Sequence, residues 1–222
     1  MNKTKTFSFD VDGVIVSWFS RLPDFLKEKG LPYKHITDLE GDNHFLPRSE
    51  IFSTDDEDIC EALITEYNRS HYIAQLDLLH PEAQYYLCKL RELGELVAVT
   101  CLGTDAISHQ MRVDNLNNVL GYGIFSEVHC IATGADKTPK LLELQKDRDV
   151  IFFVDDRACH TQQGLNAGIS SYQYIEGILT DDIDYDLKHL NSWKEIYAAA
   201  VKHSKDYDRA IEKCASLATL TL

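Results

Sequence analysis

Short apolar runs alternate with amphipathic stretches along most of the chain. Five of these runs have the composition of buried strands: 7–9, 96–100, 127–131, 150–154 and 169–174. Helical patterns lie between or after them, at 81–93, 105–120, 140–146 and 161–167, with one or two more helices over 192–217. Strands that alternate with helices usually pair in parallel, so the pattern predicts an α/β fold with a doubly wound parallel five-stranded sheet.

Residues 17–77 interrupt this alternation and show no strand pattern. Residues 31–50 contain three helix-breaking residues and are expected to be irregular. Thr54 and Glu57 form a capping-box pattern in front of a helix, with Thr54 as the expected cap. We therefore predict two domains, a core formed by 1–16 and 78–222 and a helical insert formed by 17–77.

The composition narrows the function classes. A formal net charge of −14 disfavours DNA or RNA as a partner, because both are polyanions. A small phosphorylated metabolite stays compatible with this charge, since a bound cation can invert the sign of a site locally. The six cysteines are scattered without a CxxC pair, and no leader or membrane-length apolar run is present. We expect a cytoplasmic protein with reduced thiols and no membrane partner.

Two carboxylates follow the first apolar run at a spacing of two residues, Asp10 and Asp12, and Gly13 comes directly after them. Carboxylates this close repel each other, so a cation or a shared proton is expected between them. Gly13 allows a sharp turn that brings main-chain N–H groups to the same point. The pattern indicates either a phosphoryl-binding site or a plain Asp-Gly turn after a buried strand.

Other strands also end in polar residues. Thr100 follows the second strand, and Asp155 and Asp156 follow the fourth. Lys137 and Lys140 lie in or just past the loop after the third strand. Because parallel strands place their carboxyl ends on one edge of the sheet, we expect these side chains to converge with the first carboxylate pair.

In this order, the residues resemble the four motifs of the haloacid dehalogenase-like (HAD) superfamily. The segment 9–14 resembles the first motif, 97–100 the second, Lys137 the third, and 153–156 together with 167–169 the fourth. The resemblance covers about residues 5–175. It implies a Rossmann-like core, an α-helical C1-type cap at 17–77, and hydrolysis of a small phosphomonoester.

The resemblance also implies roles for these residues. Asp10 would attack phosphorus to form an aspartyl-phosphate, and Asp12 would act as general acid and base. Thr100 and nearby N–H groups would bind the phosphoryl oxygens. Lys137 would neutralise the charge of these oxygens and of Asp10, with Lys140 as the alternative.

The implied cofactor is Mg²⁺, held by Asp10, the main-chain carbonyl of Asp12, and Asp155 or Asp156. Two positions depart from the family pattern. His160 stands where the family has Asp or Asn, and a neutral imidazole is a poor magnesium ligand. We therefore expect His160 on a helix surface and a modest metal affinity. Cys101 follows Thr100 where Asn or Ser is frequent, and a packed thiol is its expected state.

Substrate choice is expected to depend on the insert and on the residues after the first motif. The candidate substrate-binding residues are Trp18, Arg21, Arg48 and Cys101. Packing of Trp18 in the insert and simple solvation of the two arginines are the alternatives. By family analogy, the substrate would be a nucleoside monophosphate or a phosphoglycolate-like acid. A phosphotransferase or mutase, or a non-catalytic regulatory protein on the same scaffold, remain as alternative functions.

Overall fold

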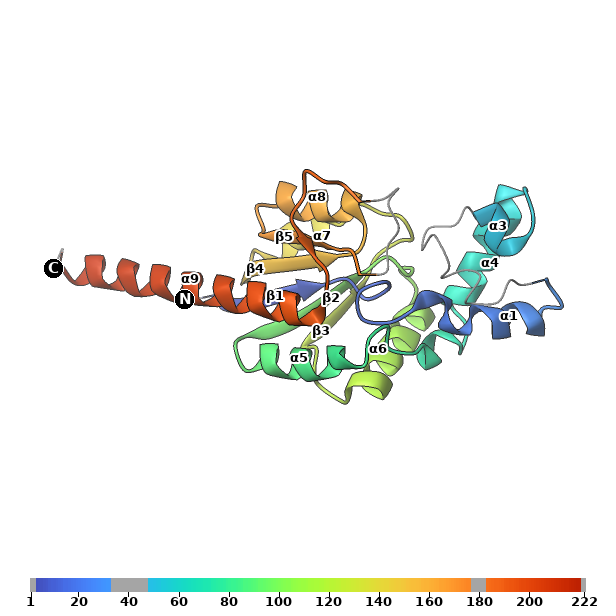
Figure 1. The fold of residues 1–222 in the computed structure, drawn as a ribbon, viewed down its shortest axis with the longest axis horizontal. Coiled ribbons are helices and arrows are strands. Elements are labelled where there is room, and N and C mark those ends of the chain that lie inside the picture. The colour runs from blue at the N-terminus through green and yellow to red at the C-terminus, as the bar shows by residue number, and fades with distance from the viewer. Residues whose placement is uncertain (1–2, 33–47, 177–182, 221–222) are drawn as a thin grey trace.

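One parallel sheet forms the centre of the molecule (Figure 1). The computed structural model describes residues 3–32, 48–176 and 183–220. Within these ranges six strands pair in the order β3-β2-β1-β4-β5-β6. Their bounds are β1 (Thr4–Phe9), β2 (Glu95–Thr100), β3 (Glu127–Cys130), β4 (Arg148–Asp155), β5 (Ser171–Tyr174) and β6 (His189–Leu190). The predicted doubly wound parallel sheet is confirmed. The two-residue strand β6 is an addition, too short to leave a recognisable pattern in the sequence.

The strand order reverses beside β1. From β1 the chain runs to β2 and β3 on one side, and β4 and β5 then extend the sheet on the other. Phe7 pairs with Leu96 of β2 and with Phe152 of β4, so β1 is the central strand of this part of the sheet. Open α/β sheets bind ligands at the carboxyl edge beside such a reversal. In this chain, that edge begins at Asp10.

Helices cover both faces of the sheet (Figure 1). One layer contains α5 (Glu82–Arg91), α6 (Ala106–Leu120) and α9 (Trp193–Leu220), and the other contains α7 (Thr138–Leu144) and α8 (Ala158–Asn166). Neighbouring residues of β4 point to opposite layers, because Phe152 packs in the core cluster of Trp193 and Phe153 in that of Leu141. Of the described helices, none is long and apolar enough to cross a membrane.

A group of short helices lies at one end of the sheet, in the blue to cyan part of Figure 1. It consists of η1 (Trp18–Arg21), α1 (Leu22–Glu28), α3 (Arg48–Phe52), α4 (Glu57–Asn68) and η2 (Ile73–Gln75). Of the stretch expected to be irregular, 33–47 lies outside the described residues, whereas 48–50 are helical. The predicted cap of α4 was wrong. Asp56, not Thr54, accepts from the N–H groups of Asp58 and Ile59, because a carboxylate one residue from the helix start reaches both.

Two chain crossings join these helices to the sheet. Val16 and Leu78 form an antiparallel bridge. The N–H of Ser17 donates to the carbonyl of Asp77 at 3.0 Å, and that of Leu79 donates to the carbonyl of Ile15 at 2.9 Å. These paired crossings coincide with the ends of the predicted insert 17–77. Its behaviour as a separate cap domain stays a prediction.

Candidate active site

Asp10 lies at the carboxyl edge of β1 with its side chain buried. Its N–H donates to the carbonyl of Val154 at 2.8 Å, which ties it to the neighbouring strand β4. Its Oδ1 accepts from the Val11 N–H at 2.7 Å and lies 2.9 Å from the Lys137 Nζ. Both of these side-chain contacts use Oδ1. The other oxygen, Oδ2, is therefore the one that remains for phosphorus or for a cation.

Lys137 lies directly before α7, at its N-cap position, and is fully buried. Its Nζ donates to the carbonyl of Val99 at 2.9 Å and to Asp155 Oδ2 at 2.7 Å, in addition to its contact with Asp10. Burial alone would lower the pKa of Lys137, but the two carboxylates outweigh this and raise it above its ordinary value. Lys140 instead pairs with Glu143 near the surface. The structure thus brings Lys137, and not Lys140, to the carboxylates.

Asp12 is held by two side chains from different elements. The Thr100 hydroxyl, at the end of β2, donates to Asp12 Oδ2 at 3.2 Å. Arg112 of α6 reaches both carboxylate oxygens with its Nη2, each at 2.6 Å. Arg112 is completely buried, whereas the Asp12 side chain keeps 23% of its surface exposed. A buried cation thus orients a carboxylate that still contacts solvent.

Sequence reasoning missed Arg112. It belongs to a buried polar stripe on α6 with Ser108 and Asn115, at i−4 and i+3. Asn115 accepts from the Arg112 Nη1 at 3.3 Å and donates to the carbonyl of Leu76 at 2.8 Å. The stripe therefore runs from Asp12 to the end of the helical insert. Polar residues at helical spacing inside an otherwise apolar face were the available signal.

The two carboxylates after β4 differ in their surroundings. Burial by itself would raise the pKa of Asp155, but Lys137 and His160 offset this and hold it below its ordinary value. Burial and the charge of Asp155 raise the pKa of Asp156 well above its ordinary value. Burial, followed by the charge of Asp155, also raises the pKa of Asp10, to about 7. Burial and mutual repulsion thus disfavour the ionised form of Asp10 and Asp156 at this edge.

Gly13 packs directly against Asp156. Its φ is +78°, and a Cβ at this position would lie 2.0 Å from Asp156 Oδ2. A side chain here would therefore be strained and would also displace the carboxylate. The turn after β1 and the end of β4 can approach this closely only with glycine at position 13.

The expected position of His160 was wrong. It was predicted on a helix surface, but it is 4% exposed in the first turn of α8. Its Nδ1 lies 3.3 Å from Asp155 Oδ1, and its Nε2 lies 4.0 Å from Cys101 Sγ. The first turn of α8 follows directly after β4, so it faces the carboxylate edge. Burial raises the pKa of the Cys101 thiol to about 12, so the thiol is protonated at neutral pH.

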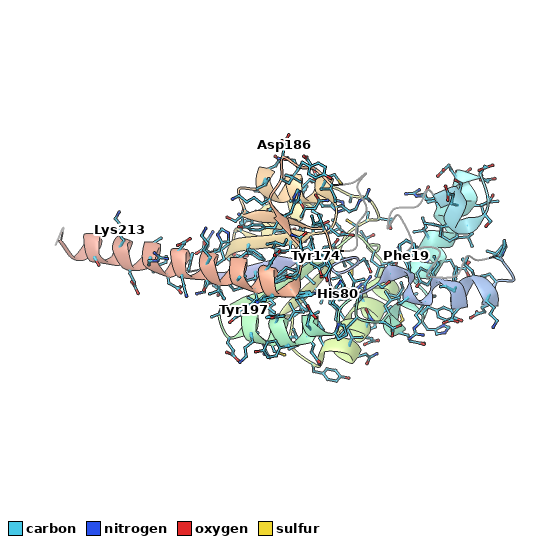
Figure 2. The ribbon with its side chains drawn as sticks, viewed as in Figure 1. Phe19, His80, Tyr174, Asp186, Tyr197 and Lys213 are labelled. Carbon is cyan, nitrogen blue, oxygen red and sulfur yellow. The ribbon has the colours of Figure 1, made fainter. Side chains whose placement is uncertain are left out.

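A cavity of about 230 Å³ opens over this edge. The carboxylates of Asp10, Asp12 and Asp156 line its floor, and Trp18, Phe19, Ile64 and Leu79 supply apolar walls. Trp18 packs edge-to-face on Tyr67 and donates to Asn68 Oδ1 at 3.0 Å. Figure 2 shows Phe19 at the junction between the helical insert and the sheet. The cavity therefore lies between the two parts of the chain.

Of the predicted substrate-binding residues, Trp18 and Cys101 line this cavity, and the two arginines lie elsewhere. Arg21 donates to Asp77 Oδ1 at 2.8 Å and to the carbonyl of Gln75 at 3.1 Å, near the surface. Arg48 lies 3.9 Å from Glu57 and is exposed. A role for either arginine in substrate binding stays a prediction.

Comparison with solved structures identifies the architecture. The chain is similar to a haloacid dehalogenase-like hydrolase from Streptococcus pneumoniae, with a TM-score of 0.64 and 19% identity over 89% of this chain and 98% of the other. It is also similar to a HAD family hydrolase from Deinococcus radiodurans, described with bound phosphate and sodium, with a TM-score of 0.56 and 15% identity over 89% and 95% of the two chains. The chain has the fold of the HAD superfamily.

Sequence comparison adds one relative. No protein-family model matches the chain. An uncharacterised 32.4 kDa protein of Enterobacteria phage T4 is 36% identical over 191 residues, which are 86% of this chain and 68% of the phage protein. The chain belongs to one family with this phage protein. The polar residues of the carboxylate edge described above are thus the main guide to its chemistry.

The carboxylate edge has donors that fit a divalent cation. Asp10, Asp155 and His160 each offer a ligand atom, and these atoms lie within 4.8 Å of one another. Burial, followed by the charge of Asp155, raises the pKa of Asp10, and a bound cation would favour its ionised form. Asp156 and the main-chain carbonyl of Asp12 lie beside this group in sequence. The donor set differs from the all-oxygen set expected for Mg²⁺ by one imidazole.

Proposed function

We propose that the protein is a divalent-metal-dependent phosphatase, using Mg²⁺ or a related cation, that hydrolyses a small phosphomonoester through an aspartyl-phosphate on Asp10. One observation carries this proposal: Asp10 and Asp12 share the cavity floor, with Lys137 Nζ 2.9 Å from Asp10 Oδ1. A carboxylate can serve as the nucleophile, a second carboxylate two residues away can move the proton, and a buried lysine can stabilise the charge in phosphoryl transfer through a covalent intermediate.

Asp10 would act first. Lys137 and the Val11 N–H hold its Oδ1, so Oδ2 would attack phosphorus. The new Oδ2–P bond forms as the bond from phosphorus to the leaving oxygen breaks. A bound divalent cation would supply charge neutralisation for the phosphoryl oxygens.

Asp12 would serve as acid and then as base. It would give a proton to the leaving oxygen, and afterwards take one from the water that hydrolyses the aspartyl-phosphate. In the structure Arg112 Nη2 and the Thr100 hydroxyl engage its oxygens. One oxygen must therefore turn away from these donors before it reaches the substrate. Thr100 can bind a phosphoryl oxygen only after the same rearrangement.

The cavity favours one of the two substrate classes expected from the sequence. Its walls are largely apolar, and among the described residues that line it Arg157 is the one Lys or Arg. The carboxylate of a phosphoglycolate-like acid would lie beside the carboxyl groups of Asp10, Asp12 and Asp156, which disfavours a further negative charge. An uncharged, partly apolar leaving group, such as a nucleoside, fits the aromatic wall formed by Trp18 and Phe19 better.

A phosphate-release screen tests the proposal. Metal-free protein would be incubated with a panel of phosphomonoesters, with and without added Mg²⁺ or Mn²⁺. Release of inorganic phosphate is expected with metal only, and Asp10→Asn should abolish it. Phosphoryl groups that reappear on a sugar would indicate a mutase instead. Turnover that persists in chelator, or in Asp10→Asn, would contradict the mechanism.

A further inference from the structure

The imidazole of His160 is buried beside the carboxylates with one nitrogen unused. Its side chain is 6% exposed, and Nδ1 forms no hydrogen bond with the described residues although Asp155 Oδ1 is 3.3 Å away. The other nitrogen, Nε2, faces the Cys101 thiol at 4.0 Å. A buried nitrogen that makes no hydrogen bond is costly, so its position beside a carboxylate cluster needs an explanation.

We propose that His160 Nδ1 is a metal ligand and that the site therefore prefers Mn²⁺ or Co²⁺ to Mg²⁺. This inference rests on the proposed metal-dependent function. His160 occupies the place where the sequence departs from the HAD pattern. In the structure its side chain is buried and faces Asp155. Imidazole suits first-row transition ions, whereas Mg²⁺ favours oxygen ligands throughout.

The neighbouring contacts leave suitable donor atoms for the ion. Lys137 Nζ contacts Asp10 Oδ1 and Asp155 Oδ2. Asp10 Oδ2 and one lone pair of Asp155 Oδ1 then remain for the ion. Asp155 Oδ1 accepts from the Arg157 N–H at 3.0 Å and also faces His160 Nδ1. With bonds of about 2.2 Å, two ligands on one ion lie at most about 4.4 Å apart. One ligand atom from each of Asp10, Asp155 and His160 lies within 4.8 Å of the others, which is close to this limit.

The local charges support a cation at this point. Asp10, Asp12, Asp155 and Asp156 contribute four carboxyl groups. Among the described residues, Lys137 contacts Asp10 and Asp155, and Arg112 contacts Asp12. The competing explanation is that His160 is a charged partner of Asp155. In that case Nδ1 would donate a proton to the carboxylate, and a metal would gain nothing from the nitrogen.

Direct metal binding separates these explanations without any turnover. Metal-free protein would be titrated calorimetrically with MnCl₂, CoCl₂ and MgCl₂, and the Mn²⁺ form examined by electron spin-echo spectroscopy for coupling to a histidine nitrogen. We expect tighter binding of Mn²⁺ and Co²⁺ than of Mg²⁺, together with nitrogen coupling. His160→Asn should weaken Mn²⁺ and Co²⁺ binding by at least about 10-fold. His160→Asp should lose the coupling and shift the preference towards Mg²⁺.

His109→Gln is the matched control, because His109 lies on α6 with its Nε2 on the carbonyl of Val128. It should bind all three ions as the unaltered chain does. Absence of nitrogen coupling in the unaltered Mn²⁺ protein would overturn the inference, and this result needs no variant to fold. An equal loss of Mg²⁺ and Mn²⁺ affinity in His160→Asn would also overturn it. Because these readouts are independent of phosphate release, failure of the proposed function would be seen separately.

Discussion

Arg112 of α6 binds Asp12, with its Nη2 at 2.6 Å from both carboxylate oxygens. The two residues are 100 positions apart in the sequence. Through Asn115, the same guanidinium is linked to the carbonyl of Leu76, beside the chain crossing of the helical insert. The proposed acid and base is thus connected to the segment that would move if the insert opens and closes.

The first prediction concerns this pair. Arg112→Lys keeps the charge but loses the planar fork, so we expect kcat to fall by about 10-fold on alkyl phosphates, whose leaving group needs a positioned proton donor. The fall should be smaller on p-nitrophenyl phosphate, whose leaving group needs little protonation. A merely structural role would reduce both substrates equally. The measurement is kcat and KM for each ester.

Removing the cation altogether should also cost stability. Arg112→Met leaves Asp12 without its buried partner, and we expect the free energy of unfolding to fall by about 3 kcal/mol. Combining it with Asp12→Asn should recover part of this loss, because the carboxylate is then gone. Urea denaturation of both single variants and the double variant measures the coupling. Strictly additive effects would mean that the two side chains do not stabilise each other.

The second prediction separates Asp10 from Asp12. Asp10→Asn should abolish turnover and leave no covalent intermediate, because an amide is a far weaker nucleophile. Asp12→Ala should slow both steps by about 10²–10⁴-fold. With p-nitrophenyl phosphate the first step suffers less than the second, so phosphoenzyme should accumulate. Intact-protein mass after rapid acid quench detects the added phosphoryl group. Its mapping to Ser, Thr or Cys101 would disprove the role of Asp10.

The third prediction is a pH dependence of stability in the metal-free protein. Burial raises the pKa of Asp10 from its ordinary 3.8 to about 7, so between these values the folded form binds a proton that the unfolded form has lost. The stabilising effect is complete below pH 3.8 and is lost as the pH rises towards 7. Asp156, whose pKa is also raised, acts in the same direction. A pKa difference of one unit between the folded and unfolded forms corresponds to about 1.4 kcal/mol. The free energy of unfolding should therefore fall by at least about 1 kcal/mol between about pH 5 and about pH 7.5.

Thermal and urea unfolding in chelator at pH 5 and pH 7.5 measure this fall. Asp10→Asn should flatten the dependence, whereas Asp24→Asn, a change on the exposed part of α1, should leave it unchanged. Added Mn²⁺ should stabilise the protein more at pH 7.5 than at pH 5, since it binds the ionised carboxylates. A metal-free protein that becomes more stable as the pH rises from 5 to 7.5 would refute the electrostatic picture.

The fourth prediction compares the cavity wall with the surface. Phe19→Ala removes part of the apolar wall, so KM for nucleoside monophosphates should rise several-fold while kcat on p-nitrophenyl phosphate changes little. Arg21→Gln breaks an exposed ion pair with Asp77 and should cost at most about 1 kcal/mol of stability. A change of substrate preference in Arg21→Gln, with none in Phe19→Ala, would mean that Arg21 binds the substrate, as expected from the sequence, and that Phe19 does not.

Some elements of this protein follow from local pattern. The apolar run before Asp10 and the one before Asp155 both became strands that pair with each other, and Lys137 reached the two carboxylates as the motif order implied. These predictions hold because strand composition is local and parallel strands end on one edge. The cap of α4 was harder to place, since Thr54 and Asp56 are both good cap residues and only the backbone path selects one.

The sequence by itself determined the parallel sheet and the carboxylates at its edge, because both depend on periodicity and on the order of short segments. The tertiary structure decided which helix faces turn inward. Arg112 reaches Asp12, and His160 reaches Asp155, because α6 packs beside β3 and η2 and α8 beside β4 and β5. A polar residue on a helix can face solvent or a site with the same local pattern. The choice depends on which element packs against it, and that contact is made only when distant parts of the chain meet.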